Sequence, residues 1–167
     1  SMPLAFTYPW MKRFTYWPQL FLGITFNYGL ILGWTSIVNE IDIVTLMFYV
    51  GAIFWTLGYD TIYGFQDIKD DEIIGLKSTS IKFKNKPKKF LYICYSFFLL
   101  SLILIGVLMN LNKIYFAIML VVGFQLYITQ INSLNIKNPL NCLKIFKSNN
   151  CLGFVVFVAL LLGKINF

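Results

Sequence analysis

The acidic residues of this chain are concentrated in one short segment. Four of its seven Asp and Glu residues lie between Asp67 and Glu72, and a fifth, Asp60, lies in the apolar stretch just before them. Asp67 and Asp71 are four residues apart, so on one continuous helix their carboxylates would share a face with Asp60 and Tyr63. Like charges at that spacing repel each other. A hard cation such as Mg²⁺, bridging the carboxylates to phosphate oxygens, would turn the repulsion into coordination.

Neighbouring side chains suit the same chemistry. Gln66 and Tyr63 offer neutral ligands or hydrogen bonds, and Asp70 adds a carboxylate beside the pair. Lys77 follows a few residues later and can lie against a phosphate as a point charge. The competing interpretation is a solvated acidic loop whose charge is balanced by nearby lysines.

A second cluster, at residues 8–19, is rich in aromatic and basic side chains and reads YPWMKRFTYWPQ. Lys12 and Arg13 are predicted to lie on the same side of the membrane as the acidic segment, where they would clamp a diphosphate. The alternative is an aromatic and basic anchor at the membrane interface, which is common in membrane proteins.

Composition identifies the elements that must position these residues. The chain has 167 residues, of which 58% are hydrophobic and 13% charged, whereas soluble domains are about 25% charged. Long continuous apolar runs predict an all-α, polytopic transmembrane helix bundle, because each segment must satisfy its own backbone in lipid. The predicted spans are about Gln19–Val38, Ile43–Tyr63, Phe90–Met109, Tyr115–Ser133 and Cys151–Ile165. The last of these five is barely long enough to cross.

The basic residues predict the orientation. All but two of the fourteen, Lys113 and Lys164, fall on the side of Lys12 when the five spans are crossed in turn. The positive-inside rule places that side, with the acidic loop, in the cytoplasm of a bacterial-type inner membrane. The net charge of +7 therefore indicates loops near anionic lipid rather than nucleic-acid binding. The start of the chain has no basic n-region, so no signal peptide is predicted.

Several other features restrict the chemistry. The chain has no His, which removes the usual general base and the commonest transition-metal ligand. Cys94, Cys142 and Cys151 form no CxxC pair and are predicted to pack helices rather than bind metal. Gly29 and Gly33 form a GxxxG motif, which we interpret as packing within the bundle, with dimerisation as the alternative.

Two blocks of sequence resemble the 4-hydroxybenzoate polyprenyltransferases of the UbiA family. They are residues 8–19 with the following Leu22 and Gly23, and residues 59–79, which read YDTIYGFQDIKDDEIIGLKST. The resemblance implies a bundle of about nine helices, in which two Asp-rich motifs hold Mg²⁺ and a polyprenyl diphosphate at the cytoplasmic face. It also implies loss of diphosphate to form an allylic carbocation. The ring of 4-hydroxybenzoate then attacks this cation beside its hydroxyl, as a step of ubiquinone biosynthesis.

The resemblance also assigns roles residue by residue. Asp67 and Asp71 match the second Asp-rich motif and would be the metal ligands. Tyr8 and Lys12 match a YxxxK element and Lys77 matches the basic residue after the motif, so these three would be catalytic. The residues expected to bind the diphosphate are Arg13, Asp60, Tyr63, Gln66 and Asp70.

One feature departs from the family pattern. The first Asp-rich motif, of NDxxD type, belongs upstream of the YxxxK element, yet no acidic residue here precedes Glu40. We therefore expect residues 1–167 to form one transmembrane domain, the C-terminal part of a UbiA-type enzyme, incomplete and inactive alone. The alternatives are a non-catalytic remnant, a split-enzyme subunit that needs an N-terminal partner, and a small cation transporter that uses Asp60.

Overall fold

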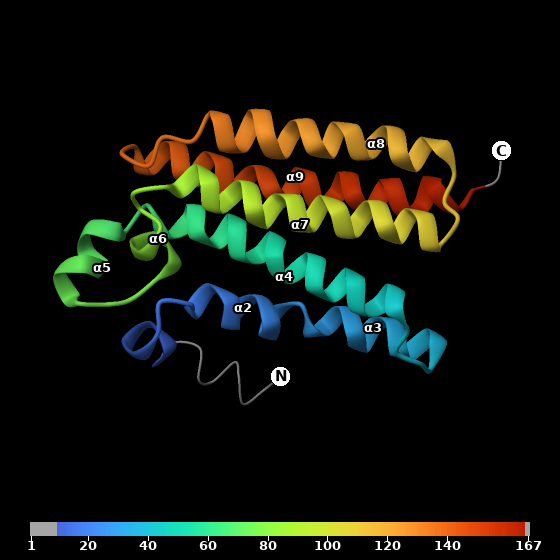
Figure 1. The fold of residues 1–167 in the computed structure, drawn as a ribbon, viewed down its shortest axis with the longest axis horizontal. Coiled ribbons are helices and arrows are strands. Elements are labelled where there is room, and N and C mark those ends of the chain that lie inside the picture. The colour runs from blue at the N-terminus through green and yellow to red at the C-terminus, as the bar shows by residue number, and fades with distance from the viewer. Residues whose placement is uncertain (1–9, 166–167) are drawn as a thin grey trace.

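The computed structural model describes residues 10–165, and within that range it contains helices joined by short loops (Figure 1). The elements are α2 (Pro18–Phe26), α3 (Tyr28–Val38), α4 (Ile43–Gly64), α5 (Ile68–Ile74), α6 (Thr79–Lys82), α7 (Pro87–Leu108), α8 (Lys113–Phe124), η1 (Gln125–Asn132) and α9 (Pro139–Lys164). The η1 element is a π-helical continuation of α8. The predicted all-α fold is confirmed.

Five helical stretches are long and apolar enough to cross a membrane, in agreement with the predicted number. They are Pro18–Val38, Ile43–Gly64, Pro87–Leu108, Lys113–Asn132 and Pro139–Lys164. The prediction that the last span begins at Cys151 is wrong, because its helix starts at Pro139, where the Asn138 side chain accepts a hydrogen bond from the Asn141 N–H. Polar residues such as Asn149 obscured this start in the sequence, but that side chain finds hydrogen-bond partners inside the bundle.

The first span is divided at Asn27, between α2 and α3 (Figure 1). The Asn27 amide donates to the Gly23 carbonyl at 2.8 Å and to Oγ1 of Thr56 on α4 at 2.8 Å. An amide in hydrocarbon needs such partners, so the break in the helix is held against the next span.

Glycines allow α4 to approach α7 closely. A Cβ atom added at Gly58 would overlap the ring of Tyr95, and Gly51 approaches α7 in the same way. Gly29 and Gly33, in contrast, face open space on α3. The prediction that these two glycines pack within the bundle is therefore wrong for the part of the chain that is described.

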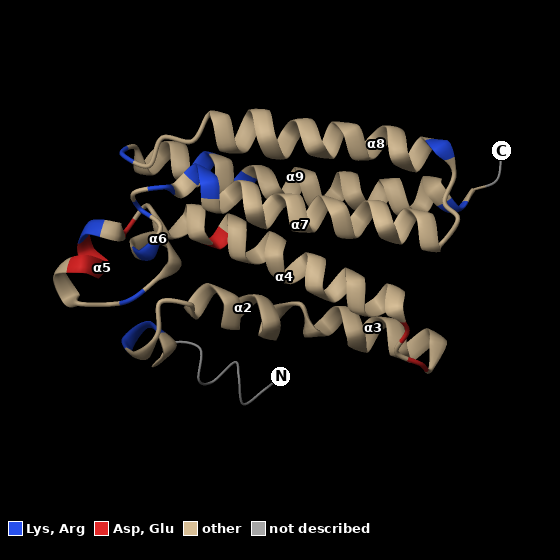
Figure 2. Ribbon diagram, in the orientation of Figure 1, with Lys and Arg blue, Asp and Glu red and all other residues tan. Residues whose placement is uncertain are grey.

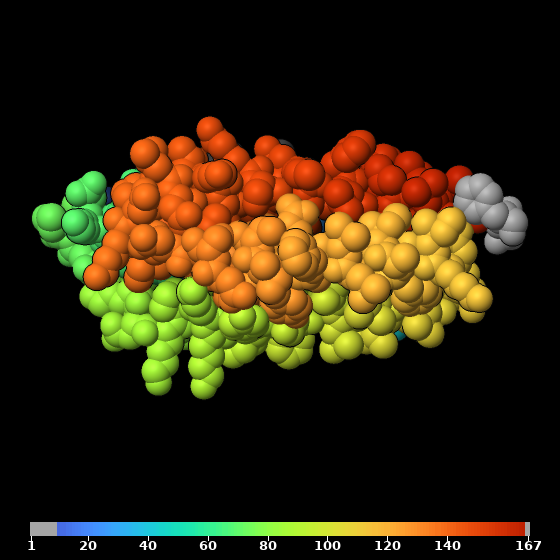
Figure 3. Space-filling view, turned by 90° about the horizontal axis from the view of Figure 1, so that it is seen from above, coloured from blue at the N-terminus to red at the C-terminus, as the bar shows by residue number. Residues whose placement is uncertain are grey.

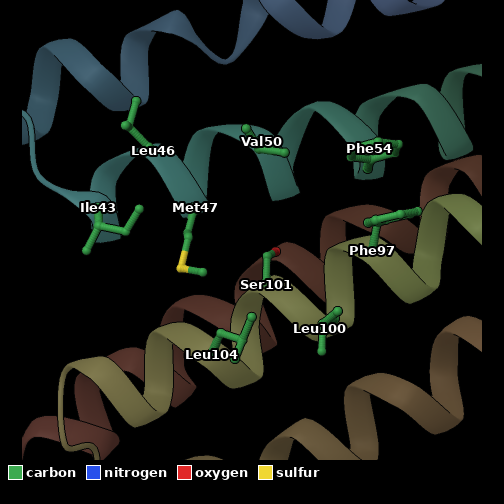
Figure 4. Close-up of a pocket in the computed structure, with 9 residues that line it drawn as sticks. All are labelled: Ile43, Leu46, Met47, Val50, Phe54, Phe97, Leu100, Ser101 and Leu104. Atoms are coloured by element: carbon green, nitrogen blue, oxygen red, sulfur yellow. The ribbon is translucent and has the colours of Figure 1, made fainter.

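An apolar groove lies between α4 and α7 on the surface of the bundle (Figure 4). Its volume is about 280 Å³, and at one end Phe54 stacks on Phe97 with ring centroids 4.8 Å apart. Ile43, Met47 and Leu104 line it elsewhere, as Figure 4 shows. Its lining is almost wholly apolar, as expected of a surface that faces lipid.

The hydrophobic core lies where α4, α7, α8 and α9 meet. Leu91, Ile105 and Val122 are fully buried there, and so are the cysteines Cys94 and Cys142. The predicted packing role of these two cysteines is confirmed, whereas Cys151 is exposed on α9. Seen from above, α7, α8 and α9 form one continuous face, and α5 projects beyond it at one end (Figure 3).

A hydrogen-bonded set of four residues, here called the polar cluster, joins four elements inside the bundle. Tyr95 of α7 donates to Oε1 of Gln130 on η1 at 2.7 Å. The Gln130 amide and the Trp55 indole of α4 both donate to Oδ1 of Asn149 on α9, at 3.2 and 2.9 Å. Because unsatisfied polar groups are costly in hydrocarbon, these bonds select one relative position of the four elements.

Most charged residues lie toward the two ends of the bundle (Figure 2). One end, the basic end, carries α5, α6, the start of α7 and the loop after η1. The opposite end carries Glu40 and Asp42 together with Lys113 and Lys164. There Asp42 caps α4, and hydrogen bonds from the side chain and backbone of Thr45 lower the pKa of its carboxyl. This is the two-sided charge distribution that the sequence predicts.

Candidate functional site

The acidic segment does not continue the helix before it. α4 ends at Gly64, and the Phe65 and Gln66 N–H groups bond to carbonyls three residues back, which tightens the last turn. Phe65 is 1% exposed and points into the core, so the chain turns before α5 begins at Ile68. One helix running from Asp60 through Asp71, which was the condition for a shared face of all four residues, is therefore not formed.

The spacing of the two predicted metal ligands nevertheless survives within α5. The Asp71 N–H donates to the Asp67 carbonyl at 2.9 Å, which places the two residues one helical turn apart. Asp67 directly precedes the first turn of α5, but its side chain makes no capping hydrogen bond. Both Asp67 and Asp70 are exposed. Asp71 is only 9% exposed and faces the rest of the bundle.

Lys12, from a distant part of the sequence, pairs with Asp71, and the backbone of Lys77 is bonded to that of Lys12. The Lys12 ammonium lies 3.4 Å from a carboxylate oxygen of Asp71. The Lys77 N–H donates to the Lys12 carbonyl at 2.7 Å, and the Lys77 ammonium lies 5.7 Å from the ring centroid of Tyr16. The structure thus joins Lys12, Asp71 and Lys77, which the sequence predicted in separate blocks. We call these three residues the Lys–Asp–Lys group.

A left-handed glycine makes this meeting possible. Gly75 ends α5 with φ of +77°, a conformation that glycine adopts without steric cost. The chain then reverses, and the Leu76 N–H donates to the Asp71 carbonyl at 2.8 Å. Lys77 is thereby directed toward Lys12.

Residues that the sequence analysis left out of the site hold the segment after Lys77. Oε1 of the buried Gln19 accepts a hydrogen bond from the Thr79 N–H at 3.0 Å. The hydroxyls of Thr79 and Thr61 are 2.6 Å apart, and the Ser80 hydroxyl donates to the Thr61 carbonyl at 2.8 Å. Their polar character in otherwise apolar helices was the only available signal, because their partners are far away in the sequence.

The other predicted residues make different contacts. Tyr63 is 41% exposed and lies against Phe146 of α9, and the Gln66 amide donates to the Tyr63 carbonyl. The Arg13 guanidinium lies over the Trp10 ring, 6.0 Å from its centroid. Asp60 is half-buried in α4. Tyr8, which was predicted to be catalytic, lies outside the described residues.

The carboxylates present match half of a magnesium site. Residues 10–165 contain no group of three or more acidic, His or Cys side chains placed to hold a metal ion. They do supply the Asp67 carboxylate, which is exposed, makes no capping hydrogen bond to α5 and lies one turn from Asp71. Mg²⁺ is typically held by one or two carboxylates together with water and substrate phosphates, so this pair fits the ion when a diphosphate is present.

Comparison with known proteins gives one consistent result. The sequence model of the UbiA prenyltransferase family matches residues 1–161. The mitochondrial 4-hydroxybenzoate polyprenyltransferases of Bos taurus and Homo sapiens are each 44% identical over 166 residues. The 4-hydroxybenzoate geranyltransferase 1 of Lithospermum erythrorhizon is 35% identical over 165 residues. No solved structure matches the chain significantly.

The match covers nearly all of this chain but only part of each relative. It covers 99% of this chain but 44% of the bovine and human proteins, and 98% of this chain but 53% of the plant protein. The chain therefore spans about half the length of the curated relatives it matches.

Proposed function

This chain belongs to the UbiA prenyltransferase family, and we propose that it takes part in the transfer of a polyprenyl group from polyprenyl diphosphate to the ring of 4-hydroxybenzoate, as a step of ubiquinone biosynthesis. The observation that carries the proposal is the meeting of Lys12, Asp71 and Lys77 at the basic end of the bundle. Relatives named for this reaction support the choice of acceptor.

The Lys–Asp–Lys group is proposed to bind and orient the diphosphate. Two ammonium groups can neutralise phosphate oxygens as point charges, and their positive charge favours departure of the anionic leaving group. Asp71 holds the Lys12 ammonium in place at 3.4 Å. The Lys77 backbone is bonded to that of Lys12, and its ammonium lies 3.5 Å from the Phe14 carbonyl. Both lysines would therefore supply positive charge from the same small region.

Asp67 and Asp71 are the residues proposed to hold Mg²⁺. When bound, the ion would neutralise charge on the leaving diphosphate as a Lewis acid. The site would be completed by acidic side chains from outside this sequence, carried either by the same polypeptide or by a separate N-terminal half. The other proposed contacts to the diphosphate are Arg13, Asp60, Tyr63, Gln66 and Asp70.

Aromatic side chains near the membrane end of the site suit the chemistry that follows. Tyr59 packs edge-on against Trp55 and Phe146, with ring centroids 5.5 and 5.8 Å away, and Tyr63 lies 4.8 Å from the Phe146 ring. Aromatic faces attract cations, and such walls exclude water that would otherwise quench an allylic carbocation. The acceptor ring would form its new carbon–carbon bond beside its hydroxyl, and the ring carbon would then lose its proton.

The membrane that houses the chain is also a proposal. The concentration of lysines at the basic end supports placing the Asp-rich loop on the cytoplasmic side of a bacterial-type inner membrane. The bovine and human relatives are named as mitochondrial proteins, so a mitochondrial membrane is the alternative. Fractionation of the source cells separates the two.

The decisive test is transfer of a radiolabelled prenyl group to 4-hydroxybenzoate in isolated membranes. One preparation contains this chain alone, and a second also contains an N-terminal half with the first Asp-rich motif. Mg²⁺-dependent labelling in the second preparation, abolished by chelation with EDTA, is the expected result. Labelled product that is independent of Mg²⁺, or no product in either preparation, would contradict the proposal.

A further inference from the structure

A groove at the basic end lies apart from the Lys–Asp–Lys group. It is formed by the first turn of α7 and the loop that joins η1 to α9, and its volume is about 750 Å³, within the usual range of ligand sites. The polar and basic residues that define it, here called the basic groove, are Lys86, Lys88, Lys89, Lys137, Asn132 and Asn135.

The basic groove has an uncompensated positive charge. None of the residues that line it is acidic. Within residues 10–165, its four lysines have no carboxylate within 4.0 Å. The Lys88 ammonium instead donates to the Asn132 carbonyl at 3.0 Å. Cations gathered in one hollow repel one another, and a bound anion would relieve that repulsion.

The groove opens at the level expected for lipid headgroups. Tyr92 lies one turn beyond Lys88 on α7, and its hydroxyl donates to Oδ1 of Asn132 at 3.0 Å. Its ring stacks on Tyr127 with centroids 5.6 Å apart. Tyrosines with one wet and one apolar end are typical of the membrane interface. Exposed apolar residues, beginning with Ile93, follow immediately along α7.

A second, apolar depression lies farther along the seam between α7 and α8. It has a volume of about 270 Å³ and is lined by Leu99 and Ile103 of α7 and by Phe116 and Leu120 of α8, among others. Ile103 lies about 16 Å from Tyr92 along the helix axis, at 1.5 Å per residue. This is about half of the 30 Å hydrocarbon core, the depth at which an acyl chain ends.

We propose that the basic groove binds the phosphate headgroup of an anionic phospholipid, whose acyl chain follows the α7–α8 seam. The lysines supply charge, the asparagine amides supply hydrogen bonds, and the seam supplies apolar contact for the chain. A metal-bound diphosphate fits less well, because the groove has no carboxylate with which to share the metal. Free phosphate would use the headgroup site but leave the seam unused.

The experiment measures lipid bound to the full chain, purified in a neutral detergent, by native mass spectrometry. Phosphatidylglycerol and phosphatidylcholine are titrated separately. Wild type is compared with Lys89→Gln/Lys137→Gln and with a matched control, Lys144→Gln/Lys147→Gln. The control removes two exposed lysines of α9 that do not line the groove. The groove variant should lose about tenfold in phosphatidylglycerol affinity, and the control less than about twofold.

Two further measurements test the proposal independently of that comparison. Lys89→Arg/Lys137→Arg retains the charge and should bind phosphatidylglycerol within about twofold of wild type. Inorganic phosphate at millimolar concentration should leave the lipid bound to wild type. Equal losses in the groove and control variants would overturn the proposal, as would no preference for the anionic lipid, failure of the Arg variant to bind, or displacement by phosphate alone.

Discussion

The Lys12–Asp71 ion pair joins two sequence blocks that are 59 residues apart. Each block has an ordinary explanation when it is considered alone, as a membrane anchor or as a solvated acidic loop. Their contact places the Lys12 ammonium beside the Asp71 carboxylate at the basic end, and it bonds the Lys77 backbone to that of Lys12. A second carboxylate lies one turn away, at Asp67. At the scale of single residues, this contact favours the proposed diphosphate site over two unrelated surface features.

Replacement of Asp71 by Asn tests that group directly. The variant keeps the shape of the side chain but removes the charge that positions Lys12 and is proposed to hold Mg²⁺. Prenyl transfer to 4-hydroxybenzoate, assayed in an active preparation that contains the complete metal site, should fall by about 100-fold or more. Glu72→Gln is the matched control. It also removes one negative charge, at the next residue, but the Glu72 side chain pairs with Lys84 instead of Lys12. Equal loss in both variants would show that net charge, rather than Asp71, matters.

Replacement of Gly75 by Ala tests the left-handed turn that directs Lys77. A Cβ atom at φ of +77° introduces about 1–2 kcal/mol of backbone strain. We expect the free energy of unfolding in detergent to fall by about 1 kcal/mol. Gly29→Ala is the control, since Gly29 is helical and faces open space, and it should cause no loss. If both variants were equally stable, the conformation assigned to Gly75 would be incorrect.

At the scale of elements, polar side chains set the positions of helices that are otherwise uniformly apolar. Asn27 ties α2 to α4, Gln19 ties α2 to the first residue of α6, and Asn149 ties α9 to both α4 and η1. Apolar contacts between helices and with lipid are energetically similar, so they specify relative position poorly. The hydrogen bonds supply that missing specificity.

Asn149→Leu tests the polar cluster. The substitution leaves the Trp55 indole and the Gln130 amide without their shared acceptor. Unfolding in detergent should then require about 1–2 kcal/mol less free energy than for the wild type. Asn150→Leu introduces the same side chain at an adjacent exposed position and should change stability little. A stable Asn149→Leu protein would mean that the cluster does not hold the helices together.

At the scale of the whole molecule, the basic end and the opposite end, which carries Glu40 and Asp42, must lie on opposite sides of the bilayer. This is tested with cysteines placed at Lys69 and Glu40 in a chain whose native cysteines have been replaced. A membrane-impermeant maleimide applied to intact bacterial cells should label only the Glu40 position. Both positions should be labelled once the membrane is permeabilised. Labelling of the Lys69 position in intact cells would reverse the proposed orientation.

The sequence by itself determined the class of fold, the number of spans, the distribution of charge and the spacing of Asp67 and Asp71. These features depend on local properties: hydropathy over about 20 residues and the four-residue repeat of a helix. The same local properties misplaced the start of α9, because hydropathy counts Asn149 as a polar residue whether or not it has a partner inside the bundle. They also allowed one helix to carry Asp60, Tyr63, Asp67 and Asp71 on a single face, because periodicity does not detect that Phe65 turns into the core.

Only the tertiary structure decided which faces meet. It identified Gly58, rather than Gly29 and Gly33, as a close helix contact. It also joined Lys12 to Asp71 and Lys77, and it separated the basic groove from that group. The physical reason is that contacts between distant segments depend on the packing of all the helices together, which no local repeat encodes. The acidic segment was therefore visible in the sequence, but its lysine partners became evident only in the folded chain.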